Sequence, residues 1–289
     1  MPSLFPFTLA LYALACTLHF VALARKNAIR LGRLSQITLA CGVVSHGVDL
    51  LWMEPRLQSV GGSGMPSLAA WLMLVFLLVR TLAQPAPLLG ALLLPVAMVL
   101  SVWSHALLPP RLLGAGWPVG DLPPMPLLTA VHVLSALAGI ALFGVAAASS
   151  LAYMLRERRL KGPTARAALP PRGGQSLLQL DTWGWQGSVF GLLALTSALV
   201  SGTYLLMQSF PALGGGVSAA LGLQARYLFS QPRYLLAVVT WLLFAGLLVG
   251  RNTLGLRGRG AAQLTLVGFW TSLGVLVIYA SRGAAGGGR

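Results

Sequence analysis

The chain has 289 residues, of which 56% are hydrophobic and 9% are charged, and its formal net charge is +15. An average soluble domain carries about 25% charged residues, so this composition excludes a water-soluble globule and predicts a multi-pass membrane protein in contact with the lipid bilayer. The mean hydropathy of +0.79 agrees. The basic residues lie mostly in short loops between apolar runs, which indicates membrane orientation and not nucleic-acid binding.

A helix that crosses a bilayer needs about 20 mostly apolar residues. Eight runs of this kind follow one another along the chain, and Pro and Gly clusters separate nearly all of them. The sequence therefore predicts an all-α, polytopic membrane helical bundle with about eight transmembrane helices. The runs are 3–24, 35–53, 67–84, 87–107, 127–155, 185–207, 234–250 and 261–280.

The distribution of Lys and Arg predicts the direction of these spans, because cytoplasmic loops retain positive charge during insertion. With the N-terminus outside, 14 of the 20 Lys and Arg residues fall in cytoplasmic connections. We therefore expect both termini on the extracytoplasmic side (N-out/C-out). Arg80, at the end of the third run, is expected to extend its guanidinium toward the head groups.

Two connections are longer than the others. Residues 156–184 are basic and contain several Pro and Gly residues, which predicts a flexible cytoplasmic linker between five spans in 1–155 and three spans in 185–289. Residues 208–233 carry a Gly triplet followed by apolar residues at nearly helical spacing. This pattern predicts an outer loop or a short helix on the membrane surface.

Ionisable residues inside spans are costly in lipid and mark either a function or a buried structural pair. At a rise of about 1.5 Å per residue, His46 lies roughly 10 Å and His132 roughly 8 Å below the outer boundary. Two imidazoles at one depth on different helices would hold a haem iron from opposite faces, between apolar walls. The sequence thus predicts non-covalent binding of haem b, with His46 and His132 as axial ligands to the metal.

Two further polar residues are candidates for the same site. Asp49 follows His46 by three residues and shares its helix face, so its carboxylate would accept a hydrogen bond from the imidazole nitrogen that does not bind metal. The alternative is a hydrogen bond from Asp49 to water or to a neighbouring helix. His105 is either a further ligand nearer the outer surface or part of an ordinary aromatic belt with Trp103. His19 is expected to be structural.

No sequence motif for catalysis is present: there is no nucleotide-binding loop, zinc-protease motif, serine-hydrolase motif or carboxylate pair. Cys16 and Cys41 lie inside apolar runs, where they are badly placed for covalent chemistry. We therefore expect that the protein is not an enzyme. Gly187 and Gly191 have GxxxG spacing, which predicts close packing of the sixth span against another helix.

From the fifth span onward, several features follow in a recognisable order. His132 enters a long apolar helix that ends in a basic stop at 155–161, and a linker rich in Leu and Pro leads to the apolar run 191–202. Ser-Gln-Pro-Arg at 230–233 precedes Thr-Trp at 240–241, and a turn rich in Gly and Arg precedes Gly-Phe at 268–269. This order resembles the cytochrome c assembly protein family, a group of membrane haem-handling proteins that includes the HemX-like proteins.

The resemblance implies an inner-membrane protein that binds or conveys haem during cytochrome c maturation, with other maturation proteins as partners. It maps the family's intramembrane histidines to His132 and, less closely, to His46. The tryptophan-rich segment of the haem-presenting members is absent, and no histidine follows His132. The alternatives are a regulator of haem supply, a transporter of another small molecule, and a scaffold subunit without haem.

Overall fold

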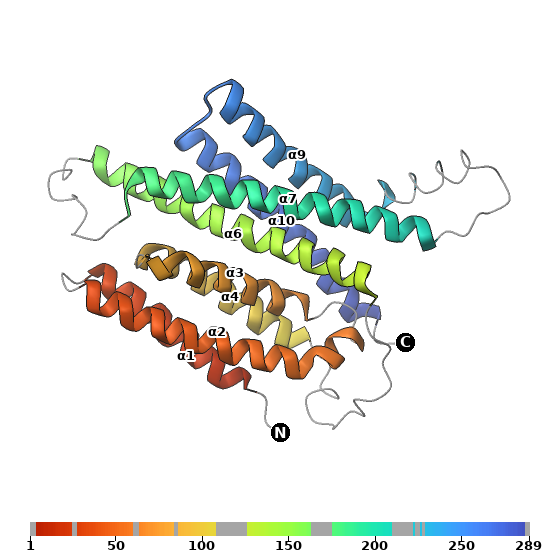
Figure 1. Ribbon diagram of the computed structural model, residues 1–289, viewed down its shortest axis with the longest axis horizontal. Coiled ribbons are helices and arrows are strands. Elements are labelled where there is room, and N and C mark those ends of the chain that lie inside the picture. Colours follow the sequence, from red (N-terminus) through yellow and green to blue (C-terminus); the bar gives the residue numbers. More distant parts are fainter. Residues whose placement is uncertain are drawn as a thin grey trace.

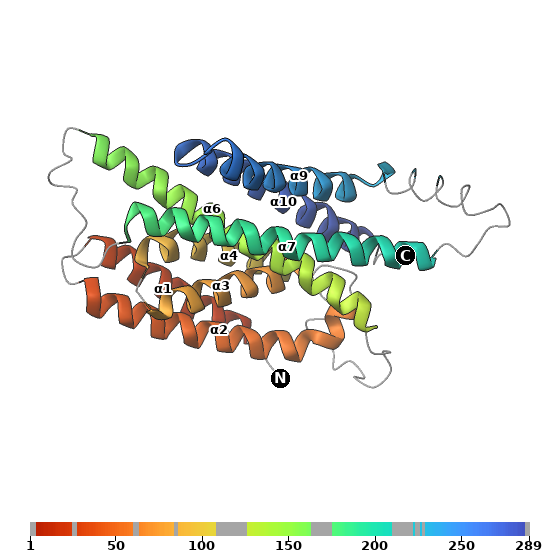
Figure 2. The ribbon, with the colours of Figure 1, turned by 45° about the horizontal axis from the view of Figure 1, so that its top comes forward.

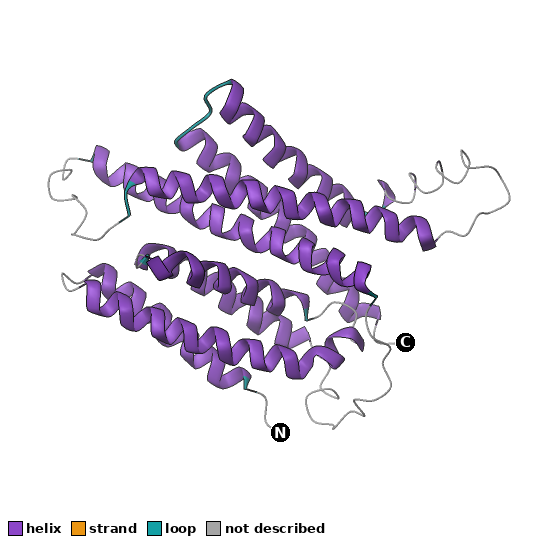
Figure 3. Ribbon diagram, viewed as in Figure 1, coloured by secondary structure: helices purple, strands orange, loops and turns teal. Residues whose placement is uncertain are grey.

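The computed structural model describes residues 4–24, 28–59, 64–83, 86–107, 126–162, 175–209, 222, 226 and 229–286. Within these residues the regular secondary structure is entirely helical (Figure 1, Figure 3). The helices are α1 (Phe5–Ala24), α2 (Ala28–Ser59), α3 (Met65–Ala83), α4 (Pro87–Leu107), α6 (Leu127–Lys161), α7 (Leu177–Ser209), α9 (Pro232–Thr253) and α10 (Arg259–Gly286).

Each of these eight helices contains a segment long and apolar enough to cross a membrane. The predicted all-helical, multi-pass architecture is therefore confirmed. Helices form here because every backbone N–H and C=O group in lipid needs a partner within its own segment. Consecutive helices run in opposite directions, so α1 begins and α10 ends at the same end of the bundle (Figure 1). The side of the membrane that this end faces stays a prediction.

Helix α7 begins earlier than the predicted span because a capping box precedes it. The Ser176 hydroxyl accepts a hydrogen bond from the Gln179 N–H at 3.1 Å, and the Gln179 side chain accepts one from the Ser176 N–H at 3.0 Å. These two bonds satisfy N–H groups that the first helical turn leaves without a partner. Residues 177–184, predicted as part of the linker, are therefore helical.

Helix α6 likewise continues past its predicted span into the linker region. Its last turn carries an ion pair between Lys161 Nζ and Glu157 Oε1 at 2.7 Å. The connection between α6 and α7 is thus shorter than the predicted 156–184, and its central part, 163–174, lies outside the described residues. Most of the outer segment 208–233, including its predicted surface helix, also lies outside them.

The helices form two groups that meet along α6 (Figure 1, Figure 2). Helices α1 to α4 pack against one another, while α6 packs along α7 and also contacts α3 and α10. The ring of Phe143 in α6 stacks on that of Phe244 in α9, with centroids 3.7 Å apart, and both side chains are buried. The division of the chain after the fifth span is therefore not a division in space.

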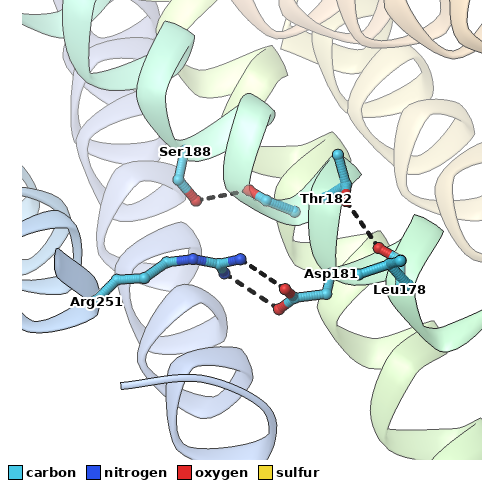
Figure 4. Close-up of polar contacts among 6 residues, drawn as sticks. Leu178, Asp181, Thr182, Ser188 and Arg251 are labelled. Atoms are coloured by element: carbon cyan, nitrogen blue, oxygen red, sulfur yellow. Dashed lines mark hydrogen bonds and ion pairs between the residues drawn. The ribbon is translucent and has the colours of Figure 1, made fainter. Parts of the chain in front are cut away.

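An ion pair joins α7 to α9 near the C-terminal end of α9. Arg251 donates to the two carboxylate oxygens of Asp181, at 3.1 Å and 2.6 Å (Figure 4). The same guanidinium lies 4.7 Å from the centroid of the Trp185 ring. Paired N–H···O bonds of this kind fix orientation as well as distance, so this contact sets how α9 lies against α7.

Arg80 of α3 also finds its partners on α7. Its guanidinium donates a hydrogen bond to the Gln186 side chain and lies 5.5 Å from the centroid of the Trp183 ring. The structure thus shows the partners of the guanidinium on a neighbouring helix, and the predicted extension of Arg80 toward the head groups stays a prediction. This contact ties the first helix group to the second.

The closest approach between α6 and α7 runs along glycines. A Cβ atom at Gly187 would lie 2.9 Å from the Leu142 carbonyl oxygen, and one at Gly191 would lie 2.5 Å from Cε1 of Phe143. Opposite them, a Cβ at Gly139 of α6 would lie 3.3 Å from the carbonyl oxygen of Gly191. The predicted role of the GxxxG pair in close helix packing is confirmed.

Replacing Gly187 with Ala is expected to lower stability, whereas the same change at Gly246 is not. At Gly187 the new methyl group would meet a backbone carbonyl, and overpacking of this kind costs about 1–3 kcal/mol. At Gly246 no described atom lies within 4 Å of a Cβ, and Ala is favoured over Gly in a helix by about 1 kcal/mol. Thermal unfolding in detergent should show G187A below wild type and G246A at or above it. Equal melting temperatures for the two variants would contradict the close packing of α6 and α7 along these glycines.

Candidate functional site

His46 sits in a hydrogen-bonded group that joins three helices. Its Nδ1 lies 3.0 Å from Tyr12 Oη of α1, and its Nε2 lies 2.8 Å from Ser67 Oγ of α3. The His46 side chain is buried, and so is Tyr12, whose ring meets the imidazole edge-on. Since both ring nitrogens have partners within the protein, the arrangement resembles a satisfied core histidine.

Asp49 and His105 lie beside the first residues of α1. The Asp49 carboxylate accepts a hydrogen bond from the Leu4 N–H at 3.1 Å, and it interacts electrostatically with His105. The His105 ring stacks on Phe5 with centroids 4.0 Å apart. The hydrogen bond predicted between Asp49 and His46 is thus replaced, because Leu4 engages the carboxylate while Tyr12 and Ser67 engage the imidazole.

Replacing Tyr12 with Phe is expected to destabilise the protein. The change keeps the ring but leaves Nδ1 of the buried His46 without its partner, and such a loss costs about 1–3 kcal/mol. Tyr204→Phe is a suitable control, since that side chain is 52% exposed. Thermal unfolding in detergent should place Y12F clearly below wild type and Y204F close to it. A wild-type melting temperature for Y12F would show that the Tyr12–His46 bond contributes nothing.

His132 belongs to α6 and its side chain contacts α7, in surroundings that differ from those of His46. Its Nδ1 lies 2.8 Å from the Ala198 carbonyl oxygen and 3.4 Å from Ser201 Oγ. A carbonyl only accepts, so Nδ1 carries the hydrogen. In the neutral imidazole, Nε2 then carries the lone pair, which is the form that binds metals. Gly202 makes room for the ring, because a Cβ there would lie 2.5 Å from Cε1 of His132.

The His132 ring lines a partly open cavity of about 310 Å³ between α6, α7, α9 and α10, with Met65 of α3 contributing to its wall. This volume lies in the range of about 300–1,000 Å³ typical of small-molecule sites. Most lining side chains are apolar, among them Leu137, Phe143 and Leu276. The polar and ionisable side chains on the wall are His132, Thr203, Gln231, Arg233, Tyr234, Thr240, Ser272 and Tyr279.

The structure therefore separates the four residues predicted from the sequence. His46, Asp49 and His105 belong to the first helix group, and none of the three lines the cavity around His132. Met65 and Ser67, at the start of α3, connect the two places, because Met65 lines the cavity and Ser67 binds His46. Whether His46 or His132 binds haem iron stays a prediction.

Sequence reasoning missed two parts of this arrangement. Tyr12 lies within an apolar run, where a tyrosine is usually an interfacial residue. Nothing in the sequence indicated that its hydroxyl contacts His46. Arg233 was noted only as part of the Ser-Gln-Pro-Arg segment. Its position directly after Pro232 and directly before the predicted span 234–250 is a signal that an anion site could have been sought there, because Pro often begins a helix and helix N-termini favour anions.

Comparison with known proteins places the cavity within a shared region. The family model described as cytochrome c assembly protein matches residues 62–282, which include every described residue that lines the cavity. A protein of Azospirillum brasilense, described as an uncharacterized 28.8 kDa protein in the nifR3-like 5' region, is 30% identical over 213 residues, covering 70% of this chain and 69% of that protein. No solved structure matches. Because the family model covers well over half of the chain, from α3 to α10, the protein belongs to the cytochrome c assembly protein family.

Proposed function

We propose that this protein binds haem as cargo during cytochrome c assembly, and that the cavity around His132 is the binding site. The observation that carries the proposal is the orientation of the His132 ring. Its Nδ1–H donates to the Ala198 carbonyl, so the Nε2 lone pair is available on an imidazole that lines an apolar cavity. Neutral imidazole with one nitrogen held in this way is a common axial ligand of haem iron.

The other residues of the cavity suit a flat apolar macrocycle. Its walls are made largely of Leu, Ala, Val and Phe side chains from four helices, and helical bundles commonly build cofactor sites between facing helices. Haem brings four of its own nitrogen ligands, so one histidine from the protein is sufficient to attach it. In the described part of the chain no three His, Cys, Asp or Glu side chains group as a metal site, which favours iron carried by a macrocycle over a bare ion.

In this proposal the protein holds haem and makes no covalent bond to it. Cys16 and Cys41 lie on α1 and α2, and neither lines the cavity. The sequence predicted His46 as the second axial ligand. His46 can take that position only if one of its ring nitrogens gives up its hydrogen bond to Tyr12 or Ser67 and binds iron instead. We therefore assign the primary ligand role to His132 and treat the role of His46 as a separate question for experiment.

Haem titration of the purified protein tests both assignments. On addition of haem, wild type in detergent should give the shifted, sharp Soret band of histidine-ligated haem, distinct from that of free haem in the same detergent, and His132→Ala should lose this band because the iron loses its ligand. His46→Gln is the matched control, since glutamine can bond Tyr12 and Ser67; we expect it to retain the band with a modest loss of stability. Melting temperatures measured on the same samples separate loss of ligand from loss of fold.

Three outcomes of the titration would change the proposal. Loss of the band in His46→Gln but not in His132→Ala would move the site to the first helix group. Loss of the band in both variants, with folding intact, would support the arrangement predicted from the sequence, in which His46 and His132 are both axial ligands. A wild type in which added haem keeps the spectrum of free haem in detergent would contradict haem binding and favour a scaffold or a carrier of another molecule.

A further inference from the structure

Arg233 is a cation on the wall of the cavity that the proposed haem site does not explain. Its guanidinium lies 5.9 Å from the centroid of the Tyr279 ring, and both side chains line the cavity together with His132. Arg233 is the second residue of α9, and Tyr279 is the last residue of the span in α10. The pair therefore lies near the end of the bundle, while His132 is six residues into α6.

The three carboxylates whose side chains the structure describes are engaged elsewhere. Asp49 accepts from Leu4, Glu157 pairs with Lys161, and Asp181 pairs with Arg251. None of these three side chains forms an ion pair with Arg233. A guanidinium beside an apolar wall is costly to desolvate unless an anion meets it.

The start of α9 adds to this preference for an anion. The first N–H groups of a helix carry partial positive charge, which favours a negative group close to the N-terminus. Arg233 presents a planar fork of N–H donors that matches a carboxylate in a bidentate way. Tyr279 holds this fork against its ring face, which limits the directions that the guanidinium can take.

We propose that Arg233 binds a carboxylate of the molecule that occupies the cavity. The ligand class is then an amphipathic organic acid, with its apolar body between α6, α7, α9 and α10 and its acid group at the Arg233 end. The inference rests on the proposed function, because haem is such a molecule: its two propionate side chains are carboxylates on one edge of an apolar ring system. Arg233 is thereby a specificity-determining residue for the acid form of the cargo.

The experiment compares the acid with its ester. Binding of haem and of haem dimethyl ester is measured by absorbance titration of wild type, Arg233→Gln, Arg233→Lys and the control Arg226→Gln, whose side chain is exposed in the described structure. Arg233→Gln should weaken binding of haem about 10- to 100-fold and leave binding of the ester nearly unchanged. Arg233→Lys should restore part of the affinity, and Arg226→Gln should alter neither.

Metal-free protoporphyrin IX, followed by its fluorescence, separates this inference from the ligand role of His132. It keeps both carboxylates and lacks iron, so Arg233→Gln should weaken it as much as haem, whereas His132→Ala should affect it little. Binding of protoporphyrin without any Soret response to haem would overturn iron ligation and support the carboxylate site. Equal effects of Arg233→Gln on acid and ester would overturn the inference and assign Arg233 to the fold or to lipid phosphate. Absence of binding of haem, ester and protoporphyrin alike would overturn both proposals.

Discussion

A polar side chain in a membrane-spanning bundle is costly without a partner, and this requirement accounts for the polar contacts between the helices. Arg251 meets Asp181, Arg80 meets Gln186, and both nitrogens of His46 have partners on other helices. Each of these contacts joins two helices that hydrophobic burial alone would not orient, because lipid tails are as apolar as the side chains between the helices. The polar contacts thus give the bundle its specific arrangement.

The same requirement distinguishes a binding site from a structural contact. His46 and His132 are the same type of residue and were predicted at similar depth, yet His46 has protein partners at both nitrogens, whereas His132 has one at Nδ1 and lines the cavity. Arg251 and Arg233 differ in the same way, since Arg251 is bound by a carboxylate and Arg233 lies against a ring. A polar side chain in lipid whose bonding capacity is unused within the described protein is the stronger candidate for contact with a ligand.

Close packing along α6 positions this candidate site. The glycines on α6 and α7 let the two backbones approach, so the carbonyl of Ala198 comes within reach of the His132 ring and Gly202 leaves space for it. On its other side, α6 meets α9 through the stacked rings of Phe143 and Phe244. Phe143 also lines the cavity. The helix that carries His132 is therefore held by contacts with both α7 and α9.

The sequence predicted the number and type of spans, because length and hydropathy report directly on the distance across a bilayer. It did not predict the ends of α6 and α7, where the helices continue past the predicted spans to the Glu157–Lys161 pair and the Ser176–Gln179 capping box. It also placed His46 and His132 at one depth without separating them around the bundle axis. In a soluble helix the polar face fixes that rotation, but here lipid-facing and buried faces are both apolar, so the pattern carries little angular information.

The position of the family match bears on which histidine belongs to the shared function. The match begins at residue 62, after α2, so it contains His105 and His132 and leaves out His46 and Asp49. Helices α1 and α2 nevertheless join the matched part through polar contacts, since Tyr12 and His46 lead to Ser67 at the start of α3. Met65, one turn or less away on α3, lines the cavity. The buried group around His46 is therefore well placed to brace the wall of the cavity, which gives those residues a role that does not require contact with the cargo.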